Sequence, residues 1–305
     1  MDLPRLAVVG VGRWGRRYVD TISRTGLARL AAVVSTQAAD GFDLAVAVHP
    51  NVEALARHRA DFDGAVVACP AAAQPAIAEQ LVRAGVPVLL QKPLSPSIEA
   101  AEWIRSSAEQ TGVLVMVDHT QLFTPAFVEL RQRVAGQVLE IMSAGGADGP
   151  INRTVGPLWD WGPHDVSMSL ALTGERPARA TADIVDRLDD DRVTYRADLW
   201  FANGSQATVR FGNAMEHKTR HLRVRTSEAI YELDGLSPRP LTVRDRRGGR
   251  PQVIATANVL PLDRVVGEFA RALQDRSARH PSLDLGVDVV TVLTECERSA
   301  GSETR

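Results

Sequence analysis

Lysine, cysteine and long hydrophobic runs are scarce in this chain of 305 residues. Its two cysteines, Cys69 and Cys296, lie far apart, which excludes a disulfide scaffold and a cysteine-rich zinc site; we expect no bound metal. No apolar run approaches the roughly 20 residues of a membrane span. The first residues lack the basic segment and long apolar stretch of a signal peptide. These absences predict a cytoplasmic protein with reduced cysteines.

The charge balance excludes a strong field of either sign. The formal net charge is −2, so the chain is not expected to attract nucleic acid or anionic lipid. Hydrophobic residues make up 45% and charged residues 24%, which is typical of a globular protein. The length favours two domains.

The basic residues are strongly biased toward arginine. Of the 35 lysines and arginines, two are lysines, Lys92 and Lys218. Where arginine serves as the ordinary surface cation, a retained lysine has a raised chance of a chemical role, because lysine can lose its proton and arginine effectively cannot.

Short apolar runs alternate with amphipathic segments in the first part of the chain. Strands are predicted at 6–9, 30–34, 65–68, 86–90 and 113–117, with helices at 13–24, 74–84 and 97–110 and a short helix around 52–57. Continuous apolar strands between helices indicate a Rossmann-type, doubly wound parallel sheet covered on both faces. This α/β domain is expected to span residues 1–119.

The pattern changes to strict alternation later in the chain. Apolar residues occupy every second position of 193–201 and 207–211, and Asn203-Gly204 between them is a strong hairpin signal. Two helical stretches, near 262–273 and 286–296, follow at the end. We therefore predict an α+β domain over residues 120–305, with a large, mostly antiparallel sheet that is open on one face.

The segment Gly10-Val11-Gly12-Arg13-Trp14-Gly15 directly follows the first strand and opens a helix. Gly10 permits a tight turn, Gly12 permits close approach of a pyrophosphate, and Gly15 permits close packing of helix and strand. The helix N-terminus adds N–H donors and a positive dipole. We expect Arg13 and Trp14 to contact the same dinucleotide. A purely structural glycine turn is the alternative.

Sites specific for NAD usually carry an acidic residue about 20 positions beyond this loop. Here the end of the second strand offers Ser35 and Thr36, without a carboxylate to repel a 2′-phosphate. Arg13 and Arg16 are available to pair with such a phosphate. The pattern favours NADP, although a site that accepts NAD as well stays open.

Gln91-Lys92-Pro93 follows the apolar strand 86–90. In an open parallel sheet the carboxyl ends of the strands face the ligand crevice. Partial desolvation there lowers the pKa of a lysine toward general acid–base use. The alternative is a cation exposed to water at a strand end.

The segment Trp159-Asp160-Trp161-Gly162-Pro163-His164-Asp165 precedes an amphipathic run. Pro163 suits the first position of a helix, which would place His164 at the helix N-terminus and favour a neutral imidazole. Asp160, four residues earlier, could orient that ring. A capping cluster with an ordinary surface histidine is the alternative.

Taken together, the glycine loop, Gln91-Lys92-Pro93 and the Asp160-x-x-x-His164 spacing resemble the Gfo/Idh/MocA oxidoreductase family over essentially the whole chain. The resemblance implies hydride transfer between a nicotinamide and a hydroxyl or ketone carbon of a sugar, cyclitol or sugar nucleotide. It assigns proton exchange to His164, polarisation of the substrate oxygen to Lys92, and orientation or substrate binding to Asp160. It also implies a cis Lys92-Pro93 peptide, and a homodimer or homotetramer built through the open sheet.

Further contacts follow from the same resemblance. Cys69 and Pro70, after the third predicted strand, would pass the nicotinamide ribose; we interpret Cys69 as packing and not as a nucleophile. His119 and Gln121 would lie near the substrate, unless they only form a polar strand end. The chain departs from the family's Glu-Lys-Pro at Gln91, which leaves the cofactor contacts of residues 91–93 open.

Two other functions stay open at this point. The first is a dinucleotide-binding regulator or scaffold without catalysis; the retained lysine and histidine argue against it. The second is a hydro-lyase or glycosidase that uses bound NAD transiently. A sugar nucleotide would need cationic anchors, for which Arg153, Arg210 and Arg220 are candidates.

Overall fold

The computed structural model describes residues 2–35, 46–149, 155–188 and 192–302, and these divide into two compact units. The first unit comprises residues 1–120 and 260–287, and the second comprises 121–259 and 288–305. The segment 260–287 thus returns to the first unit, an arrangement that a single boundary after residue 119 does not describe.

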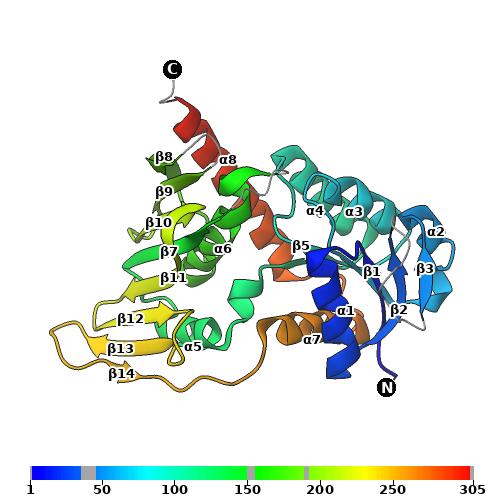
Figure 1. Ribbon diagram of the computed structural model, residues 1–305, viewed down its shortest axis with the longest axis horizontal. Coiled ribbons are helices and arrows are strands. Elements are labelled where there is room, and N and C mark those ends of the chain that lie inside the picture. Colours follow the sequence, from blue (N-terminus) through cyan, green and yellow to red (C-terminus); the bar gives the residue numbers. More distant parts are fainter. Residues whose placement is uncertain (1, 36–45, 150–154, 189–191, 303–305) are drawn as a thin grey trace. The chain divides into compact units, whose positions relative to one another are not determined.

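The first unit is built on a six-stranded parallel sheet with the order β3-β2-β1-β4-β5-β6 (Figure 1). The strands are β1 (Arg5–Val9), β2 (Arg29–Val34), β3 (Ala47–His49), β4 (Gly64–Val67), β5 (Val88–Gln91) and β6 (Val115–Asp118). All residues of β4, β5 and β6 are buried, as expected for parallel strands covered on both faces. The predicted doubly wound α/β fold is confirmed, with β3 as a strand that the sequence pattern missed.

Helices cover both faces of this sheet. They are α1 (Arg13–Thr25), α2 (Val52–Ala56), α3 (Gln74–Arg83), α4 (Ile98–Thr111) and α7 (Pro261–Gln274), with a short 3-10 helix at Arg59–Asp61. Helix α3 packs against α4, and α1 packs against α7. The strand order reverses between β1 and β4, so the carboxyl ends of these two strands form the switch point where such folds bind ligands.

The second unit contains an eight-stranded sheet with the order β14-β13-β12-β11-β7-β10-β9-β8. Its strands are β7 (Glu140–Asp148), β8 (Arg179–Arg187), β9 (Val193–Trp200), β10 (Gln206–Gly212), β11 (Ala214–Arg225), β12 (Ala229–Asp234), β13 (Leu241–Asp245) and β14 (Gln252–Val253). Only β7 and β10 pair in parallel, so the predicted mostly antiparallel sheet is confirmed.

The alternation in the sequence determines which face of this sheet is covered. Ala207, Val209 and Phe211 are buried, whereas Arg210 between them is exposed. Helix α6 (Gly156–Thr173) packs on β7, β9 and β10, and α5 (Pro125–Val134) packs against α6 and β12. A 3-10 helix, Thr120–Phe123, precedes α5, and α8 (Pro281–Ser302) ends in the second unit.

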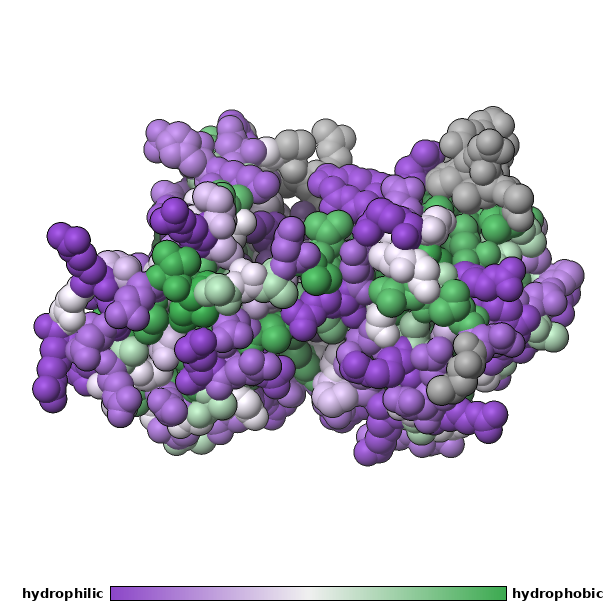
Figure 2. Space-filling model, turned by 90° about the horizontal axis from the view of Figure 1, so that it is seen from below, coloured by the Kyte–Doolittle hydropathy of each residue, from purple (hydrophilic) through white to green (hydrophobic). Residues whose placement is uncertain are grey.

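Polar side chains dominate the face of the molecule that is drawn in Figure 2. On the face drawn in Figure 2, hydrophobic residues form separate patches among hydrophilic ones. Among the described residues, no helix has the length and apolar character to cross a membrane.

Candidate functional site

The glycine loop after β1 has the geometry that a dinucleotide requires. Gly10 adopts a positive φ of 86°, a conformation that favours glycine. A Cβ on Gly15 would lie 1.8 Å from the Gly10 carbonyl oxygen, so only glycine allows the helix to pack this closely. A Cβ on Gly12 would meet nothing within 4 Å and would instead fill the open space above the loop. That space suits a pyrophosphate.

The first turn of α1 leaves its backbone donors available to a ligand. Gly12 occupies the N-cap position, no side chain caps the helix, and no acidic residue lies in the first turn. Arg13 and Trp14 are the first two helical residues, and the Arg17 guanidinium lies 4.5 Å from the centre of the Trp14 ring. The donors, the dipole and the nearby cations fit the phosphates of a nicotinamide dinucleotide.

The neighbouring strand ends lie at the same edge of the sheet. Ser35 follows β2, and its N–H donates to the His49 carbonyl over 3.1 Å. Thr36 lies outside the described residues. After β4, the Cys69 thiol donates to the Val9 carbonyl oxygen over 3.4 Å, and burial raises its pKa to about 11. This neutral, packed thiol agrees with the interpretation of Cys69 as packing. Pro70 follows it.

The predicted lysine lies at the carboxyl end of β5. Gln91 is the last residue of that strand, and Lys92 follows it directly. The Lys92-Pro93 peptide is cis, as the resemblance implied. The buried Gln74 side chain donates to the Pro93 carbonyl oxygen over 3.0 Å, which fastens this turn to α3.

Two buried titratable residues lie at the carboxyl end of β6, the strand next to β5. Asp118 ends β6 and pairs in register with Gln91, and His119 comes next. Burial raises the pKa of Asp118 to about 6, although hydrogen bonds and the Lys92 charge act in the opposite direction. Burial and Lys92 lower the pKa of His119 to about 3, so its ring is neutral. Neither ring nitrogen has a hydrogen-bond partner among the described residues.

The structure corrects the predicted start of the helix that carries His164. Helix α6 begins at Gly156, and Pro157 occupies its first turn, whereas Pro163 lies inside the helix. His164 is therefore not at a helix N-terminus, and the predicted effect of the helix dipole on it was wrong. A proline inside a helix removes one N–H donor without necessarily ending the helix. The helix ends before Gly174, which adopts a positive φ of 78°.

The four-residue spacing of Asp160 and His164 corresponds to about one turn of α6. Both residues lie within α6, and residues i and i+4 of a helix share one face. The helix therefore presents a carboxylate beside an imidazole. Gln121, the other residue predicted to contact substrate, is half-buried in the 3-10 helix before α5.

A second polar cluster beside α6 was not predicted. The Arg220 guanidinium lies 5.7 Å from the centre of the Trp161 ring. Asp165 is buried against Gly145, where a Cβ would lie 2.3 Å from its carboxylate. Burial raises the pKa of Asp165 to about 7, and Ser143 and Arg220 lower it in part. Arg220 belongs to β11, so its spacing from α6 in the sequence does not predict that it lies beside that helix.

Of the three arginines considered as anchors, Arg220 alone is described close to the helix that carries Asp160 and His164. Arg210 instead forms an ion pair with Asp186 on the exposed part of the sheet. Arg153 lies outside the described residues. No cluster of three or more histidine, cysteine or acidic side chains suited to a metal was found in the described parts of the chain.

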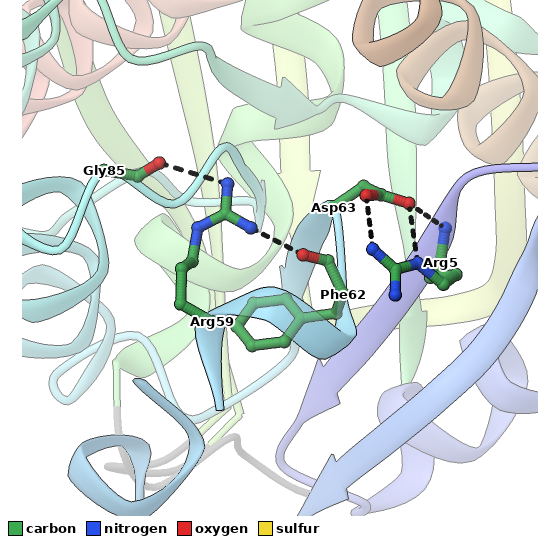
Figure 3. Close-up of polar contacts among 5 residues, drawn as sticks. All are labelled: Arg5, Arg59, Phe62, Asp63 and Gly85. Atoms are coloured by element: carbon green, nitrogen blue, oxygen red, sulfur yellow. Dashed lines mark hydrogen bonds and ion pairs between the residues drawn. The ribbon is translucent and has the colours of Figure 1, made fainter. Parts of the chain in front are cut away.

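A cavity of about 1120 Å³ lies at the opposite, amino edge of the parallel sheet. Its walls include Arg5, Arg59 and Asp63 (Figure 3). Asp63 accepts from the Arg5 backbone and guanidinium at 2.7, 3.3 and 3.0 Å, and Arg59 donates to the carbonyls of Phe62 and Gly85. Arg5 and Arg59 are thus engaged by protein groups and are not open donors for a ligand.

Comparison with known proteins agrees with this geometry. The family model described as "Oxidoreductase family, NAD-binding Rossmann fold" matches residues 4–119, and the GFO/IDH/MocA C-terminal domain matches residues 130–232. The chain belongs to the GFO/IDH/MocA family. It is therefore an oxidoreductase with an NAD-binding Rossmann domain, and the family predicted from the three motifs is confirmed.

Individual GFO/IDH/MocA relatives share the architecture at modest identity. UDP-N-acetylglucosamine 3-dehydrogenase of Acidithiobacillus ferrooxidans is 25% identical over 76% of this chain and 74% of its own length. Myo-inositol dehydrogenase Hyg17 of Streptomyces leeuwenhoekii is 33% identical over 58% of each chain. A crystal structure from Magnetospirillum magnetotacticum MS-1, which carries the general name oxidoreductase, has a TM-score of 0.87 at 30% identity and covers 97% of this chain and 100% of its own.

Proposed function

We propose that this protein transfers a hydride between a nicotinamide dinucleotide and a hydroxyl or ketone carbon of a sugar, cyclitol or sugar-nucleotide substrate. The observation that carries the proposal is the edge shared by the open glycine loop and Lys92. A phosphate cradle and a group able to polarise oxygen lie at the carboxyl ends of one sheet. Relatives named as inositol and UDP-sugar dehydrogenases support this substrate class.

The chain's own side chains would manage the proton and the substrate oxygen. His164 exchanges the proton of the reacting hydroxyl, Lys92 polarises that oxygen, and Asp160 orients the imidazole or binds a neighbouring hydroxyl. A bound nicotinamide dinucleotide supplies the hydride acceptor or donor. When a hydroxyl is oxidised, its proton passes to His164 and its carbon gives up the hydride, so charge and electrons balance.

Further residues would complete the cofactor and substrate contacts. Gly10, Gly12, Arg13, Trp14 and Gly15 would hold the pyrophosphate. Cys69, Pro70, Gln91 and Pro93 would line the nicotinamide side, beside the catalytic lysine. The neutral His119 ring and Gln121 would contact substrate, since the two ring nitrogens of His119 have no protein partner described. Arg220 is the preferred anchor for a substrate phosphate.

We propose NADP as the preferred cofactor. Ser35 directly follows β2, at the position where a carboxylate would repel a 2′-phosphate, and Thr36 would complete this contact. We predict that Ser35→Asp shifts the ratio of the NADPH and NADH dissociation constants toward NADH, whereas Ser35→Ala leaves the preference near that of the wild type. Fluorescence titration with each cofactor measures both constants. An unchanged ratio in Ser35→Asp would disprove the role of this position.

The open face of the eight-stranded sheet is the proposed surface for assembly into a homodimer or homotetramer. Met142 is 46% exposed there, and ion pairs such as Arg225–Glu140 and Arg210–Asp186 border it. Light scattering of the purified protein would measure the mass directly, and a monomer would contradict this assignment. We place the reaction in the cytoplasm, where the free thiols of Cys69 and Cys296 persist.

The function is tested by following nicotinamide absorbance with a panel of free sugars, inositols and UDP-sugars, using NADP and NAD separately. We expect turnover with at least one class of polyhydroxyl compound and its loss in both Lys92→Ala and His164→Ala. Turnover that survives unchanged in both variants would contradict the proposed roles. If cofactor binds but no compound reacts, a regulator or scaffold becomes the better account.

A further inference from the structure

Asp118 places a carboxylate at the carboxyl edge of the parallel sheet, one strand away from Lys92. It is the last residue of β6, and it pairs in parallel register with Gln91, the last residue of β5. Lys92 comes immediately after Gln91. Asp118 is 0% exposed, so water does not stabilise its charge. Two strand ends thus bring a buried anion and a lysine to the same edge.

Neutral donors hold this carboxylate in place. The buried Tyr18 hydroxyl, on the helix that follows the glycine loop, donates to Asp118 Oδ2. Thr120 Oγ1 donates to Asp118 Oδ1 over 2.8 Å. Burial, the Asp118 charge and their hydrogen bond all raise the pKa of Tyr18, so its hydroxyl keeps its proton. These two contacts fix the orientation of the carboxylate but do not neutralise it.

Lys92 is the cation that acts on Asp118. Its charge lowers the pKa of the carboxyl, in line with the position of Lys92 directly after the register partner of Asp118. His119, the adjacent titratable group, is neutral and adds no charge. Electrostatic coupling is reciprocal, so a carboxylate stabilised by Lys92 stabilises the protonated ammonium equally. A buried charge is costly unless it is partnered, and Lys92 supplies the charge of opposite sign.

The strand register places Asp118 opposite Gln91. At the position before Lys92, where the family motif is Glu-Lys-Pro, the sequence has the uncharged Gln91. The carboxylate is found instead on the register partner of Gln91 in the adjacent strand. Strand β6 therefore supplies a carboxylate beside the position where the family motif has one.

We propose that Asp118, held by Tyr18 and Thr120, is a positioning residue whose carboxylate is the counter-charge of the Lys92 ammonium and takes the place of the carboxylate missing at Gln91. The expected effect of Asp118 on turnover rests on the proposed catalytic role of Lys92. The charge coupling itself is independent of any reaction.

The scarcity of lysine makes the coupling directly measurable. Reductive methylation with ¹³C-formaldehyde labels Lys92, Lys218 and the chain's amino terminus, and NMR follows the titration of each. In Asp118→Asn we expect the pKa of Lys92 to fall by about one unit, the scale of a lost opposite charge at short range. Lys218, exposed on β11, is the internal control and should not move. An unchanged Lys92 pKa would overturn the proposal.

A reciprocal measurement covers the case in which Asp118→Asn does not fold. ¹³C-carboxyl NMR of Lys92→Met should show the Asp118 pKa rising above its wild-type value, with Lys218→Met as the matched control. Linkage requires this rise to equal the fall expected for Lys92. If the carboxyl titrates identically in wild type and Lys92→Met, the two residues are uncoupled and the proposal is wrong.

Rescue by a relocated carboxylate tests the positional part. The double variant Gln91→Glu with Asp118→Asn should return the Lys92 pKa toward the wild-type value and restore the alkaline limb of the pH profile of kcat/KM, which Asp118→Asn alone should displace to lower pH. If neither quantity recovers, a carboxylate at residue 91 does not replace the one at residue 118, and the positional part of the proposal is wrong. If Lys92→Ala retains full activity while the NMR coupling is present, the proposed function fails and the charge pair stands.

Discussion

The two edges of the parallel sheet treat charge in opposite ways. At the amino edge, Arg5 and Asp63 are about 42% and 41% exposed and form a fully partnered ion pair. At the carboxyl edge, Asp118 and His119 are almost completely buried, and the imidazole of His119 has no protein hydrogen-bond partner described. The cavity at the amino edge therefore does not by itself identify the site, because it is the carboxyl edge that carries a buried imidazole whose nitrogens no described protein group binds.

The largest expected difference between the edges lies in turnover. Lys92→Ala should lower kcat by roughly 10²–10⁴, the scale for loss of a general acid or base, while the dissociation constant for cofactor stays nearly unchanged. Lys218→Ala is the matched control, since it removes the other lysine from an exposed position. Steady-state kinetics at saturating cofactor measure this effect. If Lys92→Ala keeps the wild-type kcat, Lys92 is not a catalytic group, and the carboxyl edge is not distinguished from the amino edge by its chemistry.

The glycine loop gives the next largest effect. A methyl group at Gly12 meets no protein atom within 4 Å, so Gly12→Ala should fold normally but obstruct the phosphates and weaken cofactor binding about 10-fold or more, equivalent to about 1.4 kcal/mol. Gly149→Ala, where a Cβ also meets nothing within 4 Å, is the control. Calorimetric titration with NADPH compares the two. Equal affinity in both variants would mean that the cradle does not hold phosphate.

Stability should respond to pH with opposite signs at the two edges. The pKa of Asp118 is raised from 3.8 to about 6, so the folded chain binds this proton more tightly than the unfolded chain does. Its ionised form therefore costs stability fully above about pH 6, by roughly 1–3 kcal/mol, and the cost disappears as the pH falls to about 4. Asp118→Asn should then raise the free energy of unfolding at pH 8 but not at pH 4. Urea denaturation at both pH values measures this.

Asp63 provides the contrasting case. Partial burial raises its pKa, but hydrogen bonds from Arg5 outweigh that effect and lower it, so its ionised form stabilises the fold above the unfolded pKa and the benefit is lost as the pH falls through the lower, folded value. Asp63→Asn should therefore destabilise at pH 8. A stabilising effect of Asp63→Asn, or a destabilising effect of Asp118→Asn, at pH 8 would reverse the comparison.

The smallest effect is expected from the cation at the amino edge. Arg5→Ala should change the free energy of unfolding only slightly, because exposed ion pairs contribute little. It should leave cofactor affinity and kcat unchanged. Thermal unfolding and the titrations above detect either change. A loss of cofactor affinity in Arg5→Ala would assign a ligand to the amino-edge cavity instead.

The sequence predicted those elements whose pattern is contained within a few consecutive residues. Continuous apolar runs predicted β1, β2 and β4, since the part of each strand that is buried on both faces has no polar residue. Gly10 and Gly15 were identified because turn and packing constraints act within a few residues. The short β3 has an exposed and mixed pattern, so it gave no comparable signal.

Features that depend on tertiary placement were missed or misjudged. Two prolines precede the amphipathic part of α6. The sequence pattern favours Pro163, next to His164, as the helix start, whereas the helix begins at Gly156 and Pro157 lies in its first turn. The sequence pattern did not single out Asp118, because only the register with β5 places it opposite Gln91. Arg220 was one of three candidate anchors, and its place beside Trp161 follows from sheet pairing that spacing does not encode.

The central claim, that the carboxyl edge of the parallel sheet binds a nicotinamide dinucleotide, is tested most directly by fluorescence titration of the purified wild-type protein with NADPH and, separately, NADH. We predict saturable binding of at least one, with NADPH bound more tightly because no carboxylate stands at Ser35. If neither cofactor binds, and none is released when the protein is denatured, the assignment of this edge is contradicted.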